Sequence, residues 1–170
     1  LTVDSESLWG SPLDLLPNLT QFTASTERTV TLRWFKALPR SLRQLTLLSL
    51  YVIPEGGIAA LPPQLECLNL LYATLKGADM KGNLQNLLRL TLQGLTNVED
   101  LLYLPSTLIT LKIITINQGT PTDPSISLDE ILSKLPPKLL AWPTPICTND
   151  AKPWNEALER HIDVRSAAMM

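Results

Sequence analysis

Residues 38–47 read LPRSLRQLTL, and this ten-residue phrase recurs along the chain. Residues 61–70 read LPPQLECLNL and residues 104–113 read LPSTLITLKI, so the leucines fall at the same places in all three copies. Residues 87–92 (LLRLTL) keep the leucines of the second half without the proline. Self-similarity at a nearly fixed spacing predicts a structure built from stacked repeats.

The central leucine of each copy sets the spacing of the repeats. These anchors, including two weaker copies, are Leu19, Leu42, Leu65, Leu87, Leu108 and Leu139. The first four steps between anchors span 21 to 23 residues and the last spans 31. One leucine-rich repeat occupies 20 to 29 residues and carries the core L-x-x-L-x-L.

Over residues 13–147 the chain therefore resembles the leucine-rich repeat family. The Leu-Pro opening is similar to a proline-anchored subtype found in bacterial effectors and in fungal and amoebal repeat proteins. The resemblance implies an α/β fold of the leucine-rich repeat solenoid type. We expect a short right-handed arc with a parallel β-sheet on its concave face and a mostly irregular convex side.

The Leu-x-Leu alternation within each copy has period 2 and predicts short strands that pair in parallel. We expect them at residues 21–25, 44–48, 67–71, 89–93 and 110–114, and less regularly at 141–145. Pro143 and Pro145 argue against a true sheet strand at the last position, because proline cannot donate to a ladder. Residues 1–3 would fit the end of a preceding strand, with further repeats upstream.

Helices are expected mainly towards the C-terminus. Residues 127–135 (SLDEILSKL) repeat apolar side chains at helical spacing, begin with a serine and end before Pro136. Residues 153–165 predict a second helix that caps the last repeat. Residues 53–58 and 76–79 read as loop with at most one helical turn.

The repeats give the chain its domain organisation. We expect an N-terminal flank or partial repeat at residues 1–16, repeats over residues 17–147, and a C-terminal helical cap or tail at residues 148–170. The family consensus places Asn or Cys three residues after the last strand leucine, yet only Cys147 conforms. The other matching positions are Glu27, Leu50, Ala73, Leu95 and Ile116. Backbone groups in those turns must then find water or other backbone partners.

Composition narrows the choice of partners. Apolar residues make up 45% of the chain but aromatic ones only 5%, as stacked leucine ladders would require. The net charge of −2 argues against nucleic acid, and no apolar run approaches the ~20 residues of a membrane span. Localisation and oligomeric state stay open. Asn18 starts a glycosylation acceptor pattern, which also arises by chance.

The sequence offers little for catalysis. His161 has no nucleophile at a useful spacing, and Cys67 and Cys147 match neither a zinc motif nor a disulfide framework. No phosphate-binding glycine loop occurs. The carboxylate pairs Glu99-Asp100 and Asp129-Glu130 are typical of a turn or a helix start. We therefore expect no enzyme, no cofactor and no metal.

Basic residues gather in and before the second repeat, at Arg28, Arg33, Lys36, Arg40 and Arg43. A solvated patch and a site for an acidic partner are both open interpretations of this group. All five residues lie outside the positions expected to face inward, so their cationic groups should be accessible to solvent.

If the repeated leucines point inward, the residues beside them form three columns on the concave face. The first column is Gln21, Gln44, Cys67, Arg89 and Thr110. The second is Thr23, Thr46, Asn69, Thr91 and Lys112, and the third is Ser25, Leu48, Leu71, Gln93 and Ile114. The second column is wholly polar. A register slip of one residue would bury it, which supports the assignment.

Large apolar groups in the third column, with a polar rim, are typical of a protein-interaction site. We therefore expect a protein-binding module that uses the concave sheet. The residues expected to bind are Gln44, Thr46, Leu48, Cys67, Asn69, Leu71, Arg89, Thr91, Gln93, Thr110, Lys112 and Ile114. Two alternatives remain: a substrate-receptor segment of an F-box-type ubiquitin ligase, and a structural spacer whose concave face contacts nothing.

Overall fold

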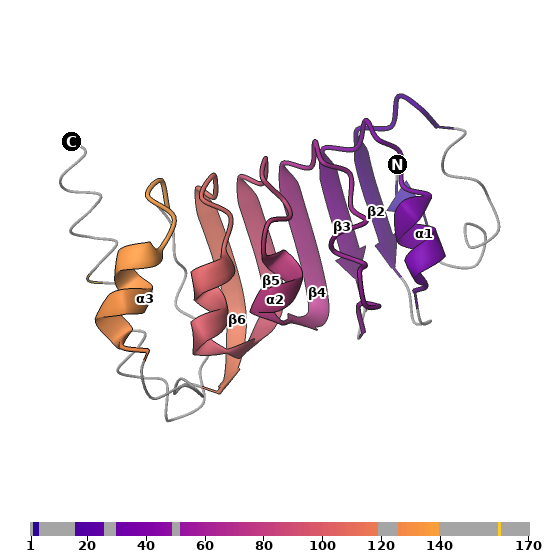
Figure 1. Ribbon diagram of the computed structural model, residues 1–170. Coiled ribbons are helices and arrows are strands. Elements are labelled where there is room, and N and C mark those ends of the chain that lie inside the picture. Colours follow the sequence, from indigo (N-terminus) through magenta and orange to yellow (C-terminus); the bar gives the residue numbers. More distant parts are fainter. Residues whose placement is uncertain are drawn as a thin grey trace.

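A computed structural model describes residues 2–3, 16–25, 30–48, 52–118, 126–139 and 160. Across these residues the chain forms a six-stranded parallel sheet whose strands follow one another in sequence order (Figure 1). The strands are β1 (Thr2–Val3), β2 (Gln21–Ser25), β3 (Gln44–Leu48), β4 (Cys67–Leu75), β5 (Arg89–Asn97) and β6 (Thr110–Gln118). With its few short helices, the protein has an α/β-type fold.

Five strands begin where the Leu-x-Leu alternation predicts, and the register joins equivalent leucines. Leu45 pairs with Leu68, Leu68 with Leu90, and Leu90 with Leu111. The residues between these leucines stay exposed or half-buried. The strand end expected over residues 1–3 is confirmed for Thr2 and Val3, since β1 pairs with β2 in parallel. The strand expected at 141–145 lies outside the described residues.

Three strands run four residues further than the sequence predicts, to residues 75, 97 and 118. In β4 the register shifts between Leu70 and Thr74, where Tyr72 adopts a φ of 76°. The next inward residue after Leu70 is then Ala73, three positions on, and pairing with β5 resumes. Ala73 and Leu95 occupy places where the family that the sequence resembles has Asn or Cys. Both side chains are apolar and buried, and the chain continues as strand at these places. The backbone N–H and C=O groups there find partners in the ladder that resumes after the bulge.

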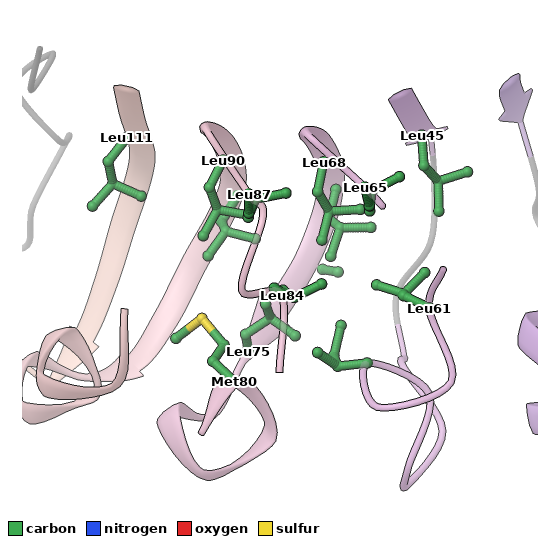
Figure 2. Close-up of a cluster of buried hydrophobic side chains, with 14 of the residues drawn as sticks. Leu45, Leu61, Leu65, Leu68, Leu75, Met80, Leu84, Leu87, Leu90 and Leu111 are labelled. Carbon is green, nitrogen blue, oxygen red and sulfur yellow. The ribbon is translucent and has the colours of Figure 1, made fainter. Parts of the chain in front are cut away.

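Stacked leucines form the core under one face of the sheet. Figure 2 shows Leu45, Leu68, Leu90 and Leu111 in a row from successive strands, with Leu65 and Leu87 beside them. All six are essentially inaccessible to solvent. Full burial of a leucine contributes about 1.5–3 kcal/mol relative to exposure, so the row is a main source of stability. Leu61, Leu75, Met80 and Leu84 extend the same cluster.

The Leu-Pro dipeptides form a recurring turn that leads the chain into each strand. The carbonyl oxygens of Pro39, Pro62, Pro105 and Pro136 each accept a hydrogen bond of 3.1 Å from the N–H group three residues later. At the fourth copy, Leu84 takes the place of the proline, and its carbonyl accepts from Leu87 N–H at 3.0 Å. Leu84 has a φ of 60°, whereas proline fixes φ near −65°. The backbone at Leu84 therefore differs from that of the turns that contain proline, and proline could not adopt it.

The helices lie on the face of the sheet that holds the leucine core (Figure 1). They are α1 (Leu32–Lys36), α2 (Gly77–Met80), the 3-10 helix η2 (Val98–Tyr103) and α3 (Leu128–Lys134). The prediction over residues 127–135 is confirmed by α3, where the Ser127 hydroxyl accepts from Glu130 N–H at 3.1 Å. Residues 53–58 form turns and α2 is a single turn, as expected.

The short helices α1 and η2 were not expected from the sequence. In α1, the Thr31 hydroxyl accepts from Trp34 N–H at 3.4 Å, and Trp34 and Phe35 are buried. A helix of two turns or fewer is too short to show a repeating apolar pattern in the sequence. Tertiary packing therefore determines whether such a segment becomes helical. The helix expected at 153–165 lies outside the described residues except for Arg160.

Candidate functional site: the open face of the sheet

The face of the sheet opposite the leucine core carries the residues predicted to bind a partner. We call it the open face and define it by the outward residues of β2 to β6. The register joins the first column as Gln21, Gln44, Cys67, Arg89 and Thr110. It joins the second as Thr23, Thr46, Asn69, Thr91 and Lys112. All ten are exposed or half-buried. The structure thus brings together the eight predicted site residues of these two columns.

The third column is less regular than the sequence predicts. Ser25 pairs with Leu48, but the β4 bulge falls immediately after Leu70, so Leu71 and Gln93 are not joined by the pairing that aligns the other columns. Leu48, Leu71 and Gln93 are half-buried. Ile114 lies in β6 after Ile113, and its side chain is outside what the structure describes. The apolar part of the open face therefore rests on Leu48 and Leu71.

Tyr72 adds an aromatic side chain that sequence reasoning missed. It follows Leu71 in the β4 bulge, and 55% of its surface is exposed. Strict alternation would have placed residue 72 inward, so only the positive φ explains its position outside the core. Exposed tyrosine beside half-buried leucine is typical of interface centres, where aromatic residues are enriched.

Polar side chains on this face are held in place by contacts between strands. Asn69 Nδ2 donates a hydrogen bond of 3.1 Å to Thr46 Oγ1 on the neighbouring strand. Just before the strands begin, Arg43 of one repeat forms an ion pair with Glu66 of the next. These contacts reduce the number of rotamers that a partner would have to order on binding.

Cys67 sits in the middle of the first column. Burial raises the pKa of its thiol, while the positive charge of Arg89 and a hydrogen bond involving Asn69 act in the opposite direction. A raised pKa keeps the sulfur as a thiol at neutral pH, where it is a poor nucleophile. Cys67 therefore contributes a small, weakly polar contact surface.

The electrostatic character of the open face is positive. Arg89 and Lys112 are exposed on β5 and β6, and the first two columns contain no Asp or Glu. The remaining groups are hydroxyls and amides that can both donate and accept hydrogen bonds. Such a surface can hydrogen-bond a protein backbone and attract carboxylates.

No group of three or more His, Cys, Asp or Glu side chains gathers where it could hold a metal ion within the described ranges. None of the helices described is long and apolar enough to cross a membrane. In comparisons with known proteins, no family model matches the sequence. No curated protein gives a significant match either.

Proposed function

We propose that the chain is a leucine-rich repeat solenoid that binds a protein partner through the open face, without catalysis. The repeat spacing of the sequence and the parallel sheet in sequence order support the solenoid assignment. In that arrangement the open face is the concave side of a short arc. Its twelve proposed contact residues are those predicted from the columns, and Tyr72 joins them.

A single observation carries the proposal. Two half-buried leucines and an exposed tyrosine, Leu48, Leu71 and Tyr72, stand on a face whose other described residues are polar or cationic. A protein interface commonly has this composition, with apolar and aromatic groups at the centre and a polar rim. Asn69, Thr46 and Arg89 would form that rim.

Site-specific photo-crosslinking tests this proposal. A benzoylphenylalanine at residue 72 replaces an exposed tyrosine on the open face, and the same group at residue 52 replaces an exposed valine outside β3 and β4. Both side chains are more than half exposed, so the changes should leave the fold intact. We expect light-dependent crosslinks to a defined protein in native lysate from position 72 and not from 52. Equal crosslinking from positions 72 and 52, or none from 72, would contradict the proposal.

A further inference from the structure

Hollows in the surface lie between successive repeats, next to the turns that lead into the strands. We call this border the entry edge and define it by residues 36–41, 59–62, 80–85 and 102–106. Because the strands are parallel, their N-terminal ends all lie at the same end of the sheet. These turns lie along that end (Figure 1). The entry edge is distinct from the open face.

Two of these hollows flank the second repeat. One of about 360 Å³ lies between residues 36–40 and 59–62, and the other of about 350 Å³ lies between Pro17 and residues 36–41. Lys36, Leu38 and Arg40 line both hollows. Each volume is near the lower end of the range for ligand pockets. A continuous extended ligand could therefore place successive side chains in them.

Every charged residue that lines the hollows is a cation. Lys36 and Arg40 line the first two hollows, and Lys81 lines a third of about 400 Å³ between the fourth and fifth repeats. No Asp or Glu lines any of the three. This is a local excess, because the whole chain has a net charge of −2. The entry edge thus concentrates positive charge on an otherwise weakly acidic protein.

The cations of the second repeat also have no carboxylate close to them in the sequence. Residues 28–54 contain five Lys and Arg and no Asp or Glu. Arg43 is paired with Glu66, but within the described ranges no carboxylate lies at ion-pair distance from Lys36 or Arg40. Both side chains are exposed. They are therefore available to an external carboxylate at little desolvation cost.

We propose that Lys36 and Arg40 bind carboxylates of an acidic, extended segment of a partner protein, whose apolar side chains enter the flanking hollows. Charge complementarity selects the acidic side chains. Leu38, Leu61 and Pro62 give the hollows apolar walls, which suit leucine- or proline-sized groups between the carboxylates. A nucleic acid fits less well, since these hollows carry no aromatic side chain for base stacking.

Fluorescence anisotropy with the full 170-residue chain tests this site. The probe is a fluorescein-labelled peptide with the repeat Glu-Leu-Pro, and its control has Gln in place of every Glu. We expect tighter binding of the Glu peptide and a loss of affinity as salt is raised, because exposed charges are screened. The double variant Lys36→Glu/Arg40→Glu should bind at least about tenfold more weakly, since two attractions become repulsions. Lys36→Arg/Arg40→Lys, which retains both charges, should keep most of the binding.

Lys76→Glu/Lys138→Glu is the matched control, because it makes the same change of net charge at two exposed lysines that lie outside both the entry edge and the open face. It should leave peptide affinity within about twofold of the parent, as charges beyond a Debye length are largely screened. Equal binding of the Glu and Gln peptides, or an equal loss in both double variants, would overturn the proposal. Tighter binding of labelled oligothymidine than of the Glu peptide would also overturn it and assign the edge to nucleic acid. None of these outcomes depends on whether the open face binds a partner.

Discussion

The Oδ1 atom of Asp100 accepts a hydrogen bond of 2.6 Å from the backbone N–H of Gly77, one repeat earlier in the chain. The Oδ2 atom of the same carboxyl group accepts from Asn97 N–H at 2.8 Å. Asp100 is only 6% exposed. It therefore joins η2 to the start of α2 of the preceding repeat, on the face of the sheet that holds the core.

The free energy of unfolding should depend on the protonation of Asp100. Burial raises the pKa of this carboxyl, and its hydrogen bonds with Asn97 and Gly77 oppose the rise only in part. Between the unfolded value of about 3.8 and the higher folded value, the native state binds more protons than the unfolded state. The stabilising contribution is therefore complete below pH 3.8 and is lost as pH rises through the folded pKa.

Asp100→Asn isolates this effect from the other carboxyl groups. The variant should lose about 1–3 kcal/mol at neutral pH, because an amide presents one oxygen to two backbone donors. It should also lack the part of the pH dependence that belongs to residue 100. Urea unfolding of both proteins from pH 3.8 upward checks this. Parallel stability curves, or a parent that gains stability over the variant as pH rises, would contradict it.

Gly77→Ala should destabilise the fold by about 1–3 kcal/mol through overpacking. An added Cβ would lie 2.3 Å from Tyr103 Cδ2, 2.7 Å from Asp100 Oδ1 and 2.9 Å from Asp100 Cα. A double-mutant cycle with Tyr103→Ala, followed by urea unfolding, measures how much of the cost comes from the ring. The cost of the glycine substitution should fall in the Tyr103→Ala background. An unchanged cost in that background would assign it to Asp100 alone.

Leu84→Pro should destabilise the protein even though four other copies of this turn have proline at the same place. The φ of 60° at Leu84 is closed to proline, and the substitution also removes a buried side chain. Leu84→Ala removes most of the side chain without the backbone conflict and should cost about 2–5 kcal/mol. We expect a larger loss for proline than for alanine in urea unfolding. A proline variant at least as stable as the parent would show that this turn can adopt the geometry of the other copies.

Neighbouring leucines of β4 should differ sharply in their contribution to stability. Leu70 is 0% exposed, and Leu70→Ala should cost about 2–5 kcal/mol. Leu71 is half-buried on the open face, so Leu71→Ala should cost less than half as much. Thermal and urea unfolding of the two variants compare them directly. Equal losses would mean that Leu71 belongs to the core and does not face a partner.

The leucine alternation was sufficient to predict where β2 to β6 begin and how they align, because a one-residue slip would expose Leu45 or Leu68 and bury Thr46 or Asn69. It could not predict the β4 bulge, since the positive φ of Tyr72 has no signature in a single tyrosine. Asp100 was interpreted as a residue of a turn or helix start. Its place in the first turn of η2 agrees, but its burial depends on Gly77 packing against it from another repeat.

The central claim is that the open face binds a protein partner through Leu48 and Leu71. Quantitative affinity capture from native lysate should compare the parent with Leu48→Glu/Leu71→Glu. The control is Val52→Glu, which adds one glutamate at a residue that is 63% exposed and lies outside β3 and β4. Circular dichroism first confirms that all three are folded. We predict a protein captured equally by the parent and Val52→Glu and lost from the double variant, whereas equal capture by all three would contradict the account.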